Sequence, residues 1–97
     1  MAPKLPMRFR IIHYFSQVSD ATLETLMEAL REEYSGEGQF QRAIFEEHLM
    51  SLRAGGLIAD RHLDLDAHGH LLQSFAITDL GRSRLHFLPA EWKSQPA

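Results

Sequence analysis

The segment Gln41–Arg84 holds the strongest structural signals of the chain: QRAIFEEHLMSLRAGGLIADRHLDLDAHGHLLQSFAITDLGRSR. Within it, Phe45, Leu49 and Leu52 recur at i, i+4 and i+7, which predicts a helix with one apolar stripe over about residues 40–54. A glycine pair follows, and glycine just past the last helical turn adopts a left-handed conformation without strain. We therefore expect the helix to end at this pair and the chain to continue as a strand.

A β-hairpin is predicted over about residues 57–77, with Asp66-Ala67-His68-Gly69 as its tip and glycine where a positive φ is needed. Thr78 then has the character of a helix N-cap. We expect a C-terminal helix over about residues 79–88, ended by Pro89, and a short tail over 89–97. The side chains expected to face the core from this helix are Leu80, Leu85 and Leu88.

Two earlier helices are predicted, over about residues 5–17 and 23–34. In the first, Arg8 and Arg10 are expected to face solvent, opposite an apolar row of Met7, Ile11, Phe15 and Val18. The second has a buried stripe formed by Leu23, Leu26, Met27, Leu30 and Tyr34. Its opposite side carries a solvated row of carboxylates, Glu24, Glu28 and Glu32.

The run Leu49-x-x-Leu52-x-x-Gly55-Gly56-Leu57-Ile58, a hairpin, and then Ile77-Thr78-Asp79-Leu80-Gly81-Arg82 resembles the winged helix-turn-helix superfamily. Its small bacterial and phage regulators, the MarR-like and PadR-like groups among them, often carry such a leucine run and a later Leu-Thr-x-x-Gly. The resemblance implies an α+β fold of three helices, an antiparallel wing of two or three strands and a short C-terminal helix. It also implies a sequence-specific, dimeric regulator of transcription that binds double-stranded DNA.

In that family the third helix enters the major groove and the wing contacts the flanking backbone. Projecting residues 40–54 at 3.6 residues per turn buries Gln41 beside the apolar stripe and turns Arg42, Ala43, Glu46, Glu47, Met50 and Arg53 outward. Arginine can pair with guanine, and glutamine with adenine. The candidate DNA-binding residues are Gln39, Gln41, Arg42, Glu46, Arg53, Arg61 and His68. A homodimer would form through the first helix, the last helix and Trp92.

The charge of the chain supports a second hypothesis, a winged-helix module that binds protein and not DNA. The net charge is −3, whereas a DNA-binding domain is expected to carry a basic face. Residues 20–37 hold six carboxylates against Arg31 alone, so the rest of the chain is mildly basic. Glu46 and Glu47 would repel phosphates, and Met50 beside them suits an apolar protein partner.

The hairpin carries a row of histidines and aspartates, with Leu63 and Leu65 on the opposite face of the first strand. Such side chains could bind Zn²⁺, Ni²⁺ or Fe²⁺, and the candidate ligands are His62, Asp64, Asp66, His68 and His70. A half-buried hairpin with a polar outer face explains the same alternation more simply. No nucleophile–base arrangement and no phosphate loop occurs, so we expect neither an enzyme nor a cofactor.

Composition limits the remaining classes. The chain of 97 residues fits one domain, spanning 1–97, and contains no cysteine, which excludes disulfides and thiolate metal sites. No apolar run approaches the ~20 residues of a membrane span. The first ten residues, MAPKLPMRFR, lack the apolar core of a secretory signal. We therefore expect a cytoplasmic protein with no membrane partner.

Overall fold

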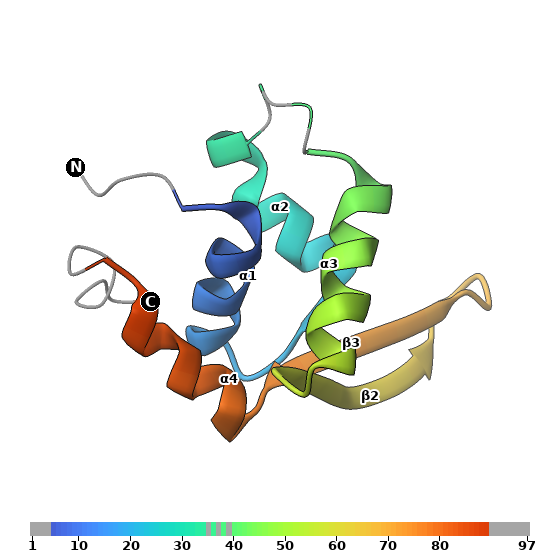
Figure 1. Ribbon diagram of the computed structural model, residues 1–97. Helices are drawn as coiled ribbons and strands as arrows, with labels where there is room; N and C mark the ends of the chain where they lie inside the picture. Colours follow the sequence, from blue (N-terminus) through green and yellow to red (C-terminus); the bar gives the residue numbers. More distant parts are fainter. Residues whose placement is uncertain (1–4, 35, 37, 39, 90–97) are drawn as a thin grey trace.

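The computed structural model describes residues 5–34, 36, 38 and 40–89, which form an α+β fold (Figure 1). The elements, in chain order, are α1 (Met7–Ser16), β1 (Ala21–Thr22), α2 (Leu23–Tyr34), α3 (Arg42–Ala54), β2 (Ile58–Leu65), β3 (Leu71–Ile77), α4 (Asp79–Ser83) and the 3₁₀ turn η1 (Arg84–Phe87). The strands form one antiparallel sheet in the order β1-β3-β2. The predicted α+β class is confirmed. The expected helix over 79–88 is instead a short α-helix followed by a 3₁₀ turn.

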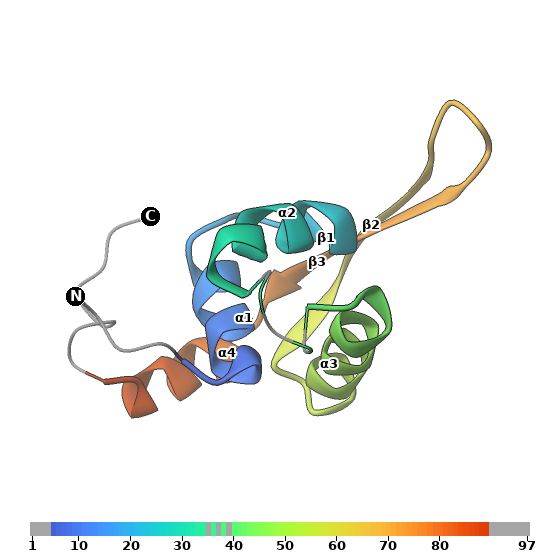
Figure 2. The ribbon, with the colours of Figure 1, turned by 90° about the horizontal axis from the view of Figure 1, so that it is seen from above.

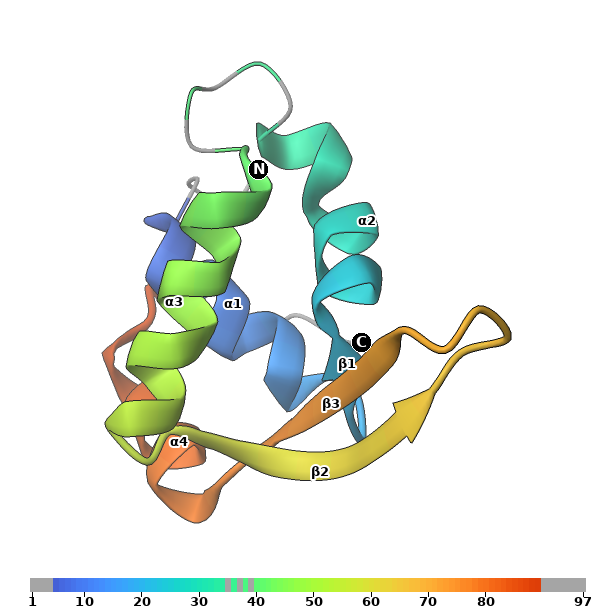
Figure 3. The same cartoon turned by 90° about the vertical axis from the view of Figure 1, so that its right-hand side faces the viewer.

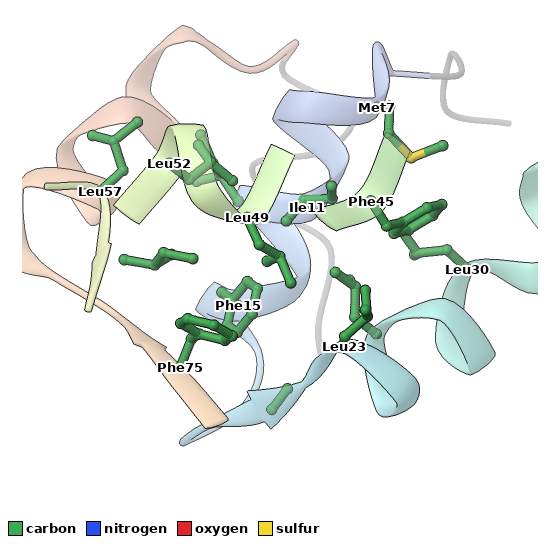
Figure 4. Packing of buried hydrophobic residues seen from close by; sticks show 14 of the residues in the cluster. Met7, Ile11, Phe15, Leu23, Leu30, Phe45, Leu49, Leu52, Leu57 and Phe75 are labelled. Atoms are coloured by element: carbon green, nitrogen blue, oxygen red, sulfur yellow. The ribbon is translucent and has the colours of Figure 1, made fainter. Parts of the chain in front are cut away.

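The core lies where α1, α2 and α3 meet one face of the sheet (Figure 4). Phe45, Leu49 and Leu52, the predicted stripe of α3, are all buried, and they pack with Phe15 of α1 and Phe75 of β3. Burying one such side chain is worth about 1.5–3 kcal/mol. The core therefore fixes α3 by one row of residues and leaves the rest of this helix available to solvent.

One charged pair also joins α1 to α2, and it corrects an expectation. Arg10 was expected to face solvent, yet only 14% of its side chain is exposed. Its guanidinium donates to both carboxylate oxygens of Glu33, with Nε–Oε2 at 2.9 Å and Nη2–Oε1 at 2.8 Å. The prediction was wrong because the helical projection of residues 5–17 contains no information about the carboxylate that α2 places beside it. Nearby, Tyr34 donates its buried hydroxyl to the Leu5 carbonyl at 2.6 Å.

Helix α3 begins at Arg42, two residues later than expected. Gln41 precedes the helix with an extended backbone, φ −134° and ψ 140°, and is exposed. Its predicted burial is therefore wrong, because a helical projection does not apply to a residue outside the helix. The Gln41 side chain instead donates to the Gly38 carbonyl at 2.8 Å. Phe40, and not Gln41, packs against the core: its ring meets Phe45 edge-on, with ring centroids 5.5 Å apart.

The glycine pair ends α3 as predicted, and the second glycine is the one that needs its conformational freedom. Gly55 has φ −80°, whereas Gly56 has φ +79°, in the left-handed region. The next amide closes the turn, since Leu57 N donates to the Leu52 carbonyl at 2.9 Å. Leu57 and Ile58 are both buried, and β2 starts at Ile58.

Strands β2 and β3 form the predicted hairpin, paired from Ile58↔Ile77 to Leu65↔Leu71. The register shifts between Asp60 and His62, so Arg61 is an extra residue in the manner of a β-bulge. Gly69 has φ +80° at the tip, and Asp66 Oδ1 accepts from the backbone N–H groups of His68 and His70 at 2.8 and 2.9 Å. The far half of the hairpin extends away from the helices (Figure 2).

Thr78 caps α4 as predicted, accepting from Gly81 N at 3.0 Å. Leu88 is buried and Leu85 packs partly against the core, but Leu80 is 43% exposed. The inward prediction for Leu80 was wrong because Gly81 is the buried position of α4, packed against Leu57 and Ile77. Trp92 lies outside the described residues. In the part of the chain that the structure covers, no helix has both the length and the apolar character to cross a bilayer.

Candidate interaction surface

The exposed side of α3 and the adjoining face of the β2–β3 hairpin form one continuous surface, which we call the α3–hairpin surface (Figure 3). Phe75 belongs to the core, so its side chain lies on the face of the hairpin that is turned toward the helices. Side chains two residues apart share a face of a strand. The same hairpin face therefore carries Asp60, Leu63, Leu65, Leu71 and Gln73.

Between α3 and β3 this surface has a groove of about 200 Å³. Core residues such as Leu49 and Phe75 form its apolar walls, and charged residues such as Arg42 and Glu46 form its rim. The full lining comprises Leu23, Glu24, Arg42, Glu46, Leu49, Met50, Leu71, Gln73 and Phe75. Pockets that hold small molecules usually measure about 300–1,000 Å³. The groove is therefore smaller than a typical cofactor site.

Arg42 lies exposed on this surface, and two carboxylates contact it. Its Nη2 donates to Glu24 Oε2 at 2.7 Å, and its Nε lies 3.5 Å from Glu46 Oε1. The hydrogen bond from Arg42 holds the pKa of the Glu24 carboxyl below its ordinary value of 4.5. Arg42 and Glu46 are exposed as the sequence predicted. Glu24 is exposed, as expected for the solvated face of α2, and it is also the partner of Arg42.

Arg53 lies at the other end of α3 and is held by β2. Its Nη2 donates to Asp60 Oδ2 at 2.8 Å, and the other oxygen of Asp60 accepts from Gln73 Nε2 at 2.9 Å. Asp60 thus links α3 to both strands of the hairpin. Sequence reasoning missed Asp60 and Gln73, because the bulge at Arg61 decides which face Asp60 shares.

The other candidate DNA-binding residues are dispersed along this side of the molecule. Gln41 is exposed just before α3, Arg61 is exposed at the bulge, and His68 is exposed at the hairpin tip. Gln39 lies outside the described residues. The structure therefore groups Arg42 with Glu46 and Arg53 with Asp60, and it leaves Arg61 and His68 farther along the hairpin.

The candidate metal ligands separate into pairs. His70 Nδ1 lies 3.4 Å from Asp66 Oδ2, whereas His62 Nε2 lies 3.9 Å from Asp20 Oδ2, in the loop before β1. His68 and His70 have ring centroids 6.2 Å apart. Across residues 5–34, 36, 38 and 40–89, no three histidine or carboxylate side chains meet as a metal-binding group.

The leucines of the hairpin are more exposed than a half-buried hairpin would have them. Leu63, Leu65 and Leu71 are 66%, 62% and 63% exposed. Their side chains point to the face that the helices cover farther back, but the hairpin extends beyond the helices at this point. Met50 of α3, at 47% exposed, continues the same apolar area. The expectation that these leucines are half-buried is thus wrong, whereas His62 and Asp64 on the opposite face are exposed as expected.

The chain has no match among the models of known protein families. No curated protein matches it either.

Proposed function

We propose that this chain is a winged helix-turn-helix protein that binds double-stranded DNA as a regulator of transcription. In this proposal α3 enters the major groove and the β2–β3 hairpin is the wing that lies on the flanking backbone. The observation that carries the proposal is the way α3 is held. One row, Phe45, Leu49 and Leu52, is buried, and the opposite side is exposed along its length beside a projecting hairpin.

Three arginines suit the contacts that this binding mode needs. Arg42 is in the first turn of α3, where a recognition helix contacts base edges, and Gln41 is exposed next to it. Arg53 at the end of α3 and Arg61 at the bulge are exposed, and they would lie near the flanking backbone in this binding mode. Backbone phosphates accept from arginine at such positions.

The ion pairs of Arg42 and Arg53 are weak enough to be replaced by contacts with DNA. More than two-fifths of each arginine side chain is exposed, at 59% and 44%. Exposed pairs contribute about 0.2–1 kcal/mol, whereas one bidentate arginine–guanine contact is worth about 1–3 kcal/mol. Arg42 can therefore leave Glu24 for a base. The net charge of −3 predicts that binding to random DNA is weak and that a chosen sequence is needed for tight binding.

The test is fluorescence anisotropy on random duplex DNA at about 50 and 200 mM salt, followed by selection of a preferred sequence. Binding should fall steeply with salt, and Arg42→Ala and Arg61→Ala should each weaken it. Arg31→Ala is the matched control, because Arg31 is exposed to 57% and paired with Glu28 but lies on α2. Absence of binding at low salt and after selection, or equal losses in all three variants, would refute the proposal.

A second function, binding of a protein partner, is favoured by one specific observation. The apolar area formed by Met50, Leu63, Leu65 and Leu71 adjoins two ion pairs, Arg42–Glu46 and Arg53–Asp60. An apolar centre with a polar rim is the usual anatomy of a protein interface. Crosslinking in cells should then enrich a partner with the wild type and lose it with Leu65→Ser. Phe9→Ser, an exposed apolar site on α1, is the control that should retain the partner.

A further inference from the structure

Strand β2 forms an outer edge of the sheet, since the order is β1-β3-β2 within the described residues. Every second residue of an edge strand directs its N–H and C=O groups away from the sheet, and such groups can pair with another strand. The bulge at Arg61 disturbs the strand only near its start. From His62 to Leu65 the pairing with β3 is regular, so a regular edge is available there.

The sequence of this edge is complementary to itself. It reads Arg61-His62-Leu63-Asp64-Leu65, and an antiparallel copy centred on Leu63 places His62 opposite Asp64 of the second copy, twice. Opposite charges in directly facing positions stabilise a strand pair, and like charges destabilise it. A centre on Asp64 would place this carboxylate opposite itself. A centre on His62 would place this histidine opposite itself, and Asp60 lies before the bulge, outside the regular segment. Charge therefore selects the register centred on Leu63.

The same register covers the two exposed leucines of β2, Leu63 and Leu65. In an antiparallel pair, facing residues share a face of the sheet, so Leu63 meets its own copy on the face that carries Leu65 and Leu71. Leu65 lies toward the bulged Arg61 of the second copy, whose long aliphatic stem can cover it. These leucines are more than 60% exposed in the single chain. The pairing thus covers the part of the α3–hairpin surface that lies along β2.

The shape of the molecule permits this pairing. The far half of the hairpin extends beyond the helices, and the outer edge of β2 faces away from β3 (Figures 2 and 3). Leu63 is five residues along the strand from Ile58, where β2 leaves the core. The helices of a second copy would lie at the opposite end of the joined hairpins, because the strands run antiparallel.

We propose that two copies of this chain associate through the outer edges of β2, antiparallel and centred on Leu63, to form one continuous sheet. The partner is a second copy because the edge pairs its own His62 with its own Asp64. This association does not depend on DNA binding. It differs from the dimer expected through the first and last helices.

Charge exchange tests the register directly. Sedimentation velocity from about 10 µM to about 1 mM wild-type protein should show a concentration-dependent dimer. His62→Asp and Asp64→Lys should each remove it. An equimolar mixture of the two variants should restore a heterodimer, because each facing pair then joins a carboxylate to a lysine or a histidine. His68→Asp makes the same change at the tip, outside the paired segment, and should leave the dimer intact.

Circular dichroism of each variant checks that the fold is retained, since His62 also lies near Asp20. A wild type that is monomeric throughout the concentration range, or a mixture that stays monomeric while the wild type dimerises, would overturn the proposal.

Disulfide crosslinking is an independent measurement, because the natural chain contains no cysteine. Leu63→Cys should form a covalent dimer on mild oxidation, since the two cysteines face each other on the two-fold axis. Leu71→Cys is the matched control: it is equally exposed on the same face but lies on β3. In the joined sheet the two β3 strands are three strand spacings apart, about 14 Å, which is already too far for a disulfide. Equal crosslinking of both variants would contradict the pairing.

Discussion

Gly81 of α4 lies directly against the carbonyl of Leu57, and a Cβ at residue 81 would overlap that oxygen. Thr78 makes the same junction polar: its N–H donates to the Leu57 carbonyl at 3.1 Å, and its hydroxyl donates to the Gly56 carbonyl at 2.6 Å. The two sequence motifs, the glycine pair with Leu57 and the later Thr78-x-x-Gly81, therefore meet in space. Together they fix the start of α4 to the point where α3 passes into β2.

Gly81→Ala should destabilise the protein by about 2–3 kcal/mol, because a backbone oxygen cannot move aside as a flexible side chain can. Helix propensity alone predicts the opposite sign, a gain of about 1 kcal/mol. Chemical unfolding by urea distinguishes the two. Gly36→Ala is the control, since a Cβ there meets nothing within 4 Å. A Gly81→Ala variant as stable as the wild type would refute the close approach.

Thr78→Val should cost about 1–2 kcal/mol, because it removes the hydroxyl that caps Gly81 N and bonds the carbonyls of Gly56 and Leu57. Valine keeps the shape of threonine, so the loss reports the hydrogen bonds. Thr78→Ser retains the hydroxyl and should lose much less. If valine and serine variants unfold at the same urea concentration, the hydroxyl is not what holds the junction.

Glu33→Gln should destabilise the chain by about 1 kcal/mol, because it weakens a bidentate, charge-assisted contact with the half-buried Arg10. Glu28→Gln removes the same charge from an exposed pair with Arg31 and should change stability by less than about 0.5 kcal/mol. Urea unfolding of both variants measures the difference. Equal effects would mean that the burial of the Arg10–Glu33 pair adds nothing to the free energy of unfolding.

Acidification should destabilise the protein through His48 of α3. Burial, and then the nearby Arg8 charge, lower the pKa of His48 below its ordinary value of 6.5. The unfolded chain therefore binds the proton more readily than the folded chain does. Stability from this group is complete above about pH 6.5 and is lost as the pH falls through the lowered pKa of the folded state. His48→Gln should reduce the fall in melting temperature between about pH 7.5 and pH 5.5.

Arg8→Gln provides the accompanying check, because it removes the second cause and leaves the burial of His48 in place. Its pH dependence in the same interval should lie between those of the wild type and His48→Gln. A His48→Gln variant with the full pH dependence of the wild type would assign the acid sensitivity in this interval to other groups.

Much of the local structure was determined by the sequence itself. The stripe of Phe45, Leu49 and Leu52, the glycine that ends α3, the hairpin tip and the Thr78 cap were all predictable. Each depends on interactions within a few residues: hydrophobic periodicity, a left-handed backbone, or a side chain bonding to its own neighbouring amides. Such signals are complete within a short window of the chain.

The tertiary structure alone decided which side chains are covered and which charges are paired. Arg10 is largely buried and forms an ion pair with Glu33. Arg53 forms an ion pair with Asp60, whose position depends on a bulge that no periodicity predicts. Leu63 and Leu65 alternate as a buried strand face would, yet they are exposed because the hairpin extends past the helices. Burial and ion pairing depend on elements distant in the sequence, so a pattern along the chain states which face is apolar but not what lies against it.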